Sequence, residues 1–279
     1  MQQLLTTIFV QPLLNILFFI YGVIPGHDFG VAVIILTAII RFALWPLTAK
    51  QLHGQKKMSA LAPDIAKVKK EAKGDKTKES QMLMELYKEK EISPFSACLP
   101  ALLQFPFLIA LYFVFQQATQ NIDSIANLLY VPVKNLAFIQ SLIQNPSSFS
   151  PTLFGFVNMA APSIPLAIIA GITQYIQVKM LAPKKVPGVK DAQAQATQTM
   201  NYLFPVFTVF IAWNLPAALP LYWTVTNVIS IAQQYIIMRE EVEEMEEVQI
   251  VSKKISAPKK KIAKSSKSKT KAKNNKKGK

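Results

Sequence analysis

One arginine, Arg41, lies inside an otherwise apolar run of 18 residues from Gly30 to Leu47. A run of this length and composition is typical of a membrane-spanning helix. An arginine near the centre of such a helix costs about 2.5–3.5 kcal/mol on insertion scales. A chain can bear this cost where water or a polar partner reaches the guanidinium. We therefore interpret Arg41 as part of a functional site within the membrane.

Other polar side chains recur in the apolar segments, and all of them are uncharged. They are Thr37, Gln104, Gln174, Gln177, Asn201, Thr224, Thr226, Asn227, Ser230, Gln233 and Gln234. Each one alone is explained by an interhelical hydrogen bond, which is worth about 0.6 kcal/mol on average. Together, one positive charge and many amides, with no acid in these segments, predict a hydrated cavity that attracts an acidic or polar peptide.

The sequence contains no recognisable catalytic motif. HExxH, GxSxG and glycine-rich phosphate loops are absent. His27 and His53 are expected on opposite sides of the membrane, and the single Cys98 has no second cysteine to pair with. We therefore expect a protein that is not an enzyme, with no cofactor, no metal ion and no small-molecule substrate.

Five apolar stretches predict an all-α, polytopic membrane protein. The chain is 51% hydrophobic and 17% charged, which agrees with this class. The predicted spans are Gly30–Lys50, Pro94–Gln117, Thr152–Leu181, Thr197–Asn214 and Ala217–Met238. The first is thus a helix over 30–50, and the other four lie within 94–238. The last two are almost contiguous, so we expect a tight helical hairpin there.

Residues 1–29 are apolar and aromatic, with Pro12 in their middle. They lack the basic start and the small-residue cleavage site of a signal peptide. Two interpretations remain for residues 4–24: a sixth span, or an amphipathic helix that lies on the outer membrane surface. We favour the surface helix.

The basic residues indicate the orientation in the membrane. The segment Lys50–Ile92 contains eleven lysines against seven acids, whereas 118–151 has one lysine and one acid. Basic loops stay in the cytoplasm. We therefore expect the amino end and loop 118–151 outside, and loop 182–196 and the carboxyl end in the cytoplasm.

Residues 51–93 show two amphipathic helical patterns on either side of a turn at Gly74 and Asp75. The apolar positions recur at helical spacings and comprise Met58, Leu61, Ile65 and Val68, then Met82, Leu83, Leu86 and Tyr87. This pattern predicts a cytoplasmic helical hairpin. Forty residues are long for a simple connector, so a functional role is expected.

The cytoplasmic basic tail, residues 239–279, carries most of the net charge. Thirteen lysines and no acids lie in Val248–Lys279. This composition predicts disorder. The tail could bind anionic lipid, or it could bind the RNA phosphates of a ribosome. Composition alone does not choose between these two partners.

Several stretches, taken in order, resemble the YidC family of membrane protein insertases, within the YidC/Oxa/Alb superfamily. They are IILTAIIRFALWPLTAKQ at 34–51, ALAP at 60–63, MELYKEKEISP at 84–94, CLPALLQFPFLIALY at 98–112, AGITQYIQVKM at 170–180 and NLPAALPLYWTVTNVISIAQQY at 214–235. Each motif alone is weak, but the ordered set is specific and covers nearly all five predicted spans.

The resemblance implies a core of five transmembrane helices with a hydrophilic groove that is closed on the outer side. Arg41 is expected at the floor of this groove, with Gln104, Gln174 and Trp223 lining it. The implied function is insertion and folding of membrane proteins in the bacterial inner membrane. The implied partners are nascent membrane proteins, the ribosome through residues 248–279, anionic lipid and, as a candidate, the Sec translocon. The alternative is a small channel or anion transporter that uses Arg41.

Overall fold

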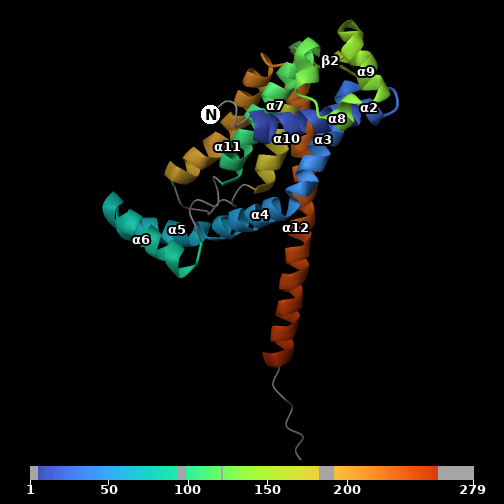
Figure 1. The fold of residues 1–279 in the computed structure, drawn as a ribbon. Helices are drawn as coiled ribbons and strands as arrows, with labels where there is room; N and C mark the ends of the chain where they lie inside the picture. Colours follow the sequence, from blue (N-terminus) through green and yellow to red (C-terminus); the bar gives the residue numbers. More distant parts are fainter. Residues whose placement is uncertain (1–5, 93–98, 121, 182–191, 257–279) are drawn as a thin grey trace, which may run out of the picture. The chain divides into compact units, whose positions relative to one another are not determined.

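The structure is a computed structural model, and it describes residues 6–92, 99–120, 122–181 and 192–256 (Figure 1). Nearly all of this part is helical, and the strands form one small sheet. The chain divides into two compact units, Met1–Ile237 and Met238–Lys279. The first of these units contains every functional candidate except the basic tail.

The amino-terminal segment is helical and packs on the helix that carries Arg41. A short π-helix, η1 (Thr6–Val10), leads into α2 (Gln11–Val23), and α2 contacts α3 (Phe29–Ala43). Asp28 begins α3, because its Oδ1 accepts a hydrogen bond from the Val31 amide at 2.8 Å. This cap fixes the start of α3, and with it the position of Arg41 thirteen residues further along the chain.

The predicted helix over 30–50 is wrong in one respect, because it is broken. The helix α3 ends at Ala43, and α4 (Trp45–Ala60) continues at an angle of 65°. Pro46 explains the break, since in a continuous helix its ring would collide with the carbonyl of Phe42. Pro46 lies in the first turn of α4, where backbone N–H groups have no acceptor within the helix. Its lack of an N–H therefore costs no hydrogen bond. The helix α4 extends to Ala60, ten residues beyond Lys50, where the predicted span ends.

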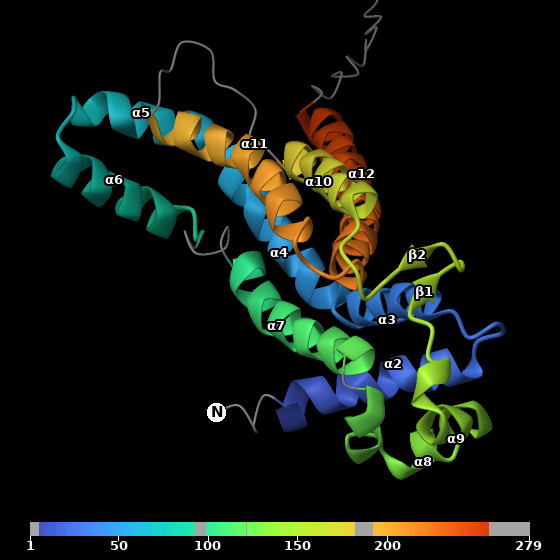
Figure 2. The same cartoon turned by 90° about the horizontal axis from the view of Figure 1, so that it is seen from above.

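Two helices follow α4 and contact each other, α5 (Ala62–Ala72) and α6 (Lys76–Glu89) (Figure 2). Lys73 and Gly74 adopt positive φ values of 50° and 91°, which reverse the chain between them. Asp75 then caps α6 by accepting from the amides of Thr77 at 2.9 Å and Lys78 at 3.1 Å. The turn therefore falls where the sequence places it, and the cytoplasmic location of this helix pair stays a prediction.

The stretch between the second and third predicted spans is largely structured. After α7 (Leu99–Gln120) come η3 (Ile122–Asn127), α8 (Val131–Lys134), α9 (Ala137–Gln144) and η4 (Pro146–Ser148). The strands β1 (Thr152–Leu153) and β2 (Val157–Asn158) pair antiparallel, with Thr152 opposite Asn158. The predicted span Thr152–Leu181 is therefore too long, because its helix, α10, covers only Ile164–Leu181. Gly155, with φ of 72°, and Pro162 favour the turn and extended backbone that precede this helix.

The last two described helices are α11 (Ala192–Ala212) and α12 (Ala218–Ser256). The first turn of α12 is tied to the loop before α10, since the Ala217 and Ala218 amides donate to the carbonyls of Ala161 at 2.9 Å and Met159 at 3.1 Å. The start of α11 lies five residues before the predicted span at Thr197. Loop 182–196 therefore contains the beginning of a helix, and its residues 182–191 lie outside the described residues.

The prediction of a disordered tail is wrong for residues 248–256, which belong to α12. Residues 239–256 contain neither proline nor glycine, and six of them are glutamate, which favours helix. Pro258 follows two residues after the last helical position, where a helix commonly ends. Residues 257–279 lie outside the part of the chain that the structure describes.

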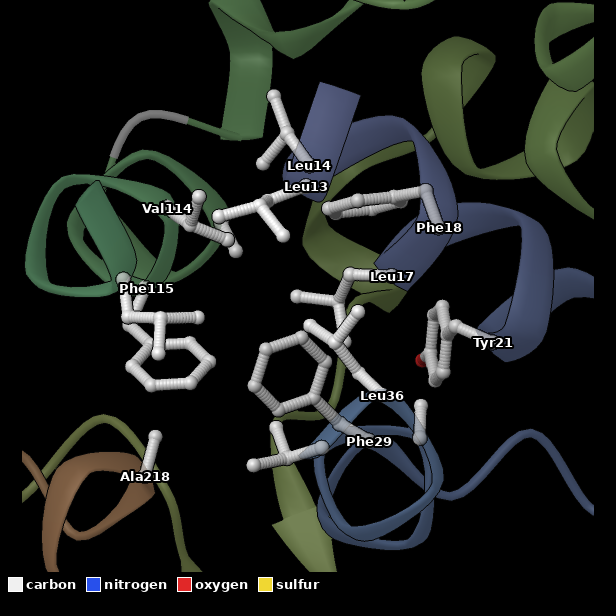
Figure 3. Packing of buried hydrophobic residues seen from close by; sticks show 14 of the residues in the cluster. Leu13, Leu14, Leu17, Phe18, Tyr21, Phe29, Leu36, Val114, Phe115 and Ala218 are labelled. Carbon is white, nitrogen blue, oxygen red and sulfur yellow. The ribbon is translucent and has the colours of Figure 1, made fainter. Parts of the chain in front are cut away.

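The apolar core of the first unit lies where α2, α3, α7 and the start of α12 meet (Figure 3). Fully buried side chains from these helices include Leu17, Phe18, Phe29, Leu36 and Phe115. By length and composition, Thr6–Val23 could cross a membrane, and the bent pair α3–α4 could be a second span. The choice between a surface helix and a span for residues 4–24 therefore stays open.

Candidate functional site: a polar cluster around Arg41

Arg41 lies in the last turn of α3, immediately before the bend into α4. Its Nη2 donates a hydrogen bond of 3.1 Å to the backbone carbonyl of Thr226 on α12. The end of a helix carries partial negative charge, which favours a cation in its last turn. Its Nε is buried and has no hydrogen-bond partner among the described residues. The guanidinium therefore contacts α12 through Nη2, while its buried Nε has no partner among the described residues.

The face of α12 that meets Arg41 carries a line of polar side chains, which we call the α12 polar stripe. Its members recur at helical spacings and are all buried: Thr226, Asn227, Ser230, Gln233 and Gln234. All five were among the polar residues singled out in the sequence. Their burial within one helix face means that polar groups, rather than apolar ones, fill this part of the interior.

The α12 polar stripe reaches two further helices. The Asn227 amide donates to the Ala170 carbonyl at 3.2 Å and to the Thr173 hydroxyl at 3.1 Å, both on α10. The Gln233 amide donates to the Thr48 hydroxyl on α4 at 3.4 Å. Together with the contact to Arg41, these hydrogen bonds connect α12 with α3, α4 and α10.

Several polar atoms of this region are buried without a hydrogen-bond partner in the described part of the chain. They are the Gln51 Nε2, Gln55 Oε1 and Thr226 Oγ1 atoms and both amide atoms of Gln234. A buried polar group left unpaired costs about 1–3 kcal/mol. These groups therefore gain no stability from hydrogen bonds within the described part of the chain.

Gln51 and Gln55 belong to the same surface of α4 as Thr48, because the three residues are spaced at three and four positions. Gln51 and Gln55 on α4 and Gln234 on α12 thus have in common buried amide atoms without a partner among the described residues. Neither Gln51 nor Gln55 was predicted as a site residue, since both fall within the predicted cytoplasmic hairpin, residues 51–93. Their polar spacing after Thr48 was the available signal.

No contact with Arg41 is described for the other three predicted groove residues, Trp223, Gln174 and Gln104. Trp223 lies on α12 one turn before Thr226 and packs against the apolar core, half-buried. Gln174 follows Thr173 on α10 and is also half-buried. Gln104 belongs to α7, but its side chain lies outside the described residues. The grouping of Arg41, Gln104, Gln174 and Trp223 around one groove stays a prediction.

The outer surface of α10 and α11 is strongly apolar. Exposed side chains include Ile172 on α10 and Phe204, Phe207 and Phe210 on α11, with Phe210 69% exposed. Apolar surfaces of this kind mark contact with lipid or with protein. A polar stripe buried between helices and an apolar exterior together define the class: a helical membrane protein with a polar interior.

Comparison with known proteins identifies the family. The model of the 60Kd inner membrane protein family matches residues 19–245. A membrane protein insertase YidC of Clostridium tetani is 35% identical over 209 residues, which are 75% of this chain and 81% of that protein. The corresponding insertase of Clostridium acetobutylicum is 34% identical over 236 residues, 84% of each chain. The chain belongs to this family of bacterial inner membrane proteins.

A longer relative matches this chain over only part of its own length. The membrane protein insertase YidC of Syntrophobacter fumaroxidans is 34% identical over 236 residues, which cover 84% of this chain but 38% of that protein. The resemblance drawn from the sequence motifs is thus confirmed. The residues 19–245 that match the family model include Arg41 and the α12 polar stripe.

Proposed function

We propose that this chain inserts membrane proteins into the bilayer, and assists their folding, through a hydrophilic groove bounded by α3, α4, α10 and α12. The relatives' shared name, membrane protein insertase YidC, supports the activity. The observation that carries the groove is the contact of Arg41 with the α12 polar stripe. Arg41 is proposed at its floor, with Gln104, Gln174 and Trp223 as further lining residues.

The groove would act by lowering a solvation barrier. A hydrophilic segment of the inserting protein, the client, loses hydration when it enters a bilayer. Polar groups already held within the membrane replace part of that hydration, and Arg41 attracts acidic residues. The membrane potential adds about 2.3 kcal/mol per charge for each 100 mV. The apolar client segment then moves along the lipid-facing sides of α10 and α12. No covalent step and no nucleotide hydrolysis is required.

The topology and the partners are part of the same proposal. The positive charge of 50–92 and of the tail supports a cytoplasmic location for both, with the amino end outside. The helix pair α5–α6 and residues 248–279 would then hold a translating ribosome or nascent chain near the groove. Anionic lipid is a second partner of the tail, and the Sec translocon is a candidate neighbour.

Protease protection tests the function with purified components. A small single-span client is synthesised in the presence of liposomes that contain only this protein, with empty liposomes as the control. We expect the outer segment of the client to become protected only where the protein is present. Absence of protection by a folded protein would contradict the proposal. An ion conductance that requires Arg41, without client insertion, would favour the alternative of a small channel or anion transporter.

A further inference from the structure

The turn between β1 and β2 carries two exposed phenylalanines. Phe156 is 90% exposed and Phe154 is 64% exposed. Between them lies Gly155, and we call these three residues the aromatic tip. Figure 2 shows the two strands beside α3, with the turn between them pointing away from α10. Two large apolar rings displayed side by side mark a contact with lipid or with protein.

The aromatic tip is fixed to the start of α3. The Phe154 amide donates a hydrogen bond to Oδ2 of Asp28, the residue whose Oδ1 caps this helix. The preceding Leu153 is buried against Gly30, where an added Cβ atom would stand 2.5 Å from the Leu153 Cβ atom. Phe154 itself adopts a φ of 52°, a left-handed conformation that is uncommon for a bulky residue. The fold therefore holds a large ring in a strained conformation at the surface, and such strain points to a function.

The aromatic tip lies at one end of the membrane helices. Directly after β2, the Met159 carbonyl accepts a hydrogen bond of 3.1 Å from the Ala218 amide, at the start of α12. Pro162, shortly before α10, forms a bridge with Pro216 in the turn between α11 and α12. Trp213 follows α11 directly and is 51% exposed. Tryptophan is enriched at the boundary between membrane and water. A membrane surface is therefore expected at the level of the tip.

Two observations favour lipid over protein as the partner of the aromatic tip. Residues 135–178 contain no charged residue, so this part of the chain offers a protein partner no salt bridge. The area is also small, because a phenylalanine side chain buries about 150–250 Å², whereas a specific protein interface needs about 800 Å² on each side. Two rings are too few for a stable protein complex, but they suffice to enter a lipid surface.

We propose that the aromatic tip inserts into the lipid where headgroups meet acyl chains, and thereby anchors the start of α3 to the membrane surface. Phe154 and Phe156 supply the apolar surface, and the hydrogen bond to Asp28 attaches the tip to α3. The expected depth is about 5–10 Å, as for other apolar surfaces at the membrane boundary. This inference goes beyond the proposed insertase function, and its test requires no client.

A fluorescent label in proteoliposomes tests the proposal. Cys98, the single cysteine of the sequence, is replaced by alanine, and one new cysteine carries the fluorophore NBD. Phe156→Cys places the label at the aromatic tip. Gln140→Cys, on the exposed polar side of α9, is the control for water, and Phe207→Cys on α11 is the control for lipid. The quenchers are lipids with a nitroxide either just below the headgroup or near the end of an acyl chain.

The label at position 156 should emit at a shorter wavelength than the label at position 140. The shallow nitroxide should quench it more strongly than the deep one, because the tip is expected at the membrane boundary. The label at position 207 should be quenched by the deep nitroxide as well, and the label at position 140 by neither. Phe154→Cys gives a second measurement at the tip if Phe156→Cys does not fold.

A further label separates the effect of the rings from the affinity of the fluorophore itself for lipid. Asn158→Cys places it on β2, at an exposed position close to the aromatic tip. With this label, Phe154→Ser/Phe156→Ser should shift the emission toward that of position 140, since the apolar anchor is removed. Phe154→Trp/Phe156→Trp should leave the emission unchanged, because tryptophan also favours the membrane boundary.

Three results would overturn the proposal. Equal emission from positions 156 and 140 in folded variants would show that the tip lies in water. A short-wavelength emission at position 156 without quenching by either lipid would show that a second copy of the chain covers the tip. An unchanged emission at position 158 in the double serine variant would show that the two rings do not anchor the hairpin.

Discussion

Single polar side chains decide how α12 is held in the first unit. Asn227 is the best partnered of them, with two acceptors on α10, whereas Gln234 has none among the described residues. Residues of the same stripe therefore have different roles. Asn227 connects helices, whereas the Gln234 amide makes no such connection within the described residues.

Asn227→Ala should lower the stability of the protein, because Ala170 and Thr173 lose their donor. Interhelical hydrogen bonds of membrane proteins average about 0.6 kcal/mol and reach about 1.7. Thermal unfolding in detergent would measure the change, with Asn127→Ala on the surface of η3 as the control. Equal Tm values for the two variants would contradict the assigned role of Asn227.

At the scale of elements, one glycine allows α10 and α11 to lie against each other. A Cβ atom at Gly171 would stand 2.3 Å from Val209 Cγ2 and 3.2 Å from the Pro205 carbonyl. No real Cβ tolerates the first distance, so any side chain at position 171 separates the helices or displaces Val209. Small residues at helix contacts are typical of membrane proteins for this reason.

Gly171→Ala should therefore destabilise the protein by about 1–3 kcal/mol, the usual cost of overpacking. The double variant Gly171→Ala/Val209→Ala removes the colliding methyl group and should recover part of the loss. Unfolding of the two single variants and the double variant gives the coupling energy. Additive effects, without recovery, would show that Val209 is not the obstacle.

The helix pair α5–α6 offers a local test of its own. Asp75→Ala removes the cap of α6 and should cost about 1 kcal/mol. Hydrogen exchange of the Thr77 and Lys78 amides should then be about fivefold faster. Asp64→Ala is the matched control, since Asp64 pairs with Lys67 on the surface, at 2.9 Å. Equal exchange in both variants would mean that the cap does not hold the first turn of α6.

Apolar runs predicted the membrane helices, helical spacing predicted the pair α5–α6, and polar residues within the runs suggested where a site would lie. All five members of the α12 polar stripe were identified in this way. Periodicity does not report a bend, however, and the apolar run through Arg41 therefore concealed the break at Pro46. The strands β1 and β2 are too short, at two residues each, to show an alternating pattern.

Composition misled the prediction where the helix α12 continues into the lysine-rich segment. Val248–Ser256 was grouped with the lysine-rich tail, yet it continues the helix that begins in the first unit. Gln51 and Gln55 were missed for a related reason, because glutamine is unremarkable in a segment read as cytoplasmic. Only the packing of α4 against α7 and α10 reveals that this segment belongs to the helical unit.

At the scale of the whole molecule, the charge is unevenly distributed. The net charge is +15, and residues 257–279 alone contain eleven lysines. Such a segment is attracted both to RNA phosphates and to anionic lipid, with strong dependence on salt. Its removal should leave the groove intact.

Truncation after Ser256 should weaken co-sedimentation with ribosomes at low salt by about tenfold or more, because many phosphate contacts are lost. Liposomes of anionic lipid, used in the same assay, show whether lipid binding falls in parallel. Replacement of the eleven lysines by glutamine in the full-length chain is the control for length. An unchanged ribosome pellet would remove the proposed role of the tail.

The most direct measurement of the central claim compares client insertion by the unsubstituted protein, Arg41→Lys and Arg41→Ala in proteoliposomes. The clients are identical except for one aspartate or asparagine in the translocated segment. We expect Arg41→Ala to slow the aspartate client about tenfold and the asparagine client far less, because hydrogen bonds to charged groups contribute about 1.5–3 kcal/mol. Arg41→Lys should largely retain insertion of both. If Arg41→Ala slowed both clients by the same factor, this would contradict an electrostatic groove at Arg41.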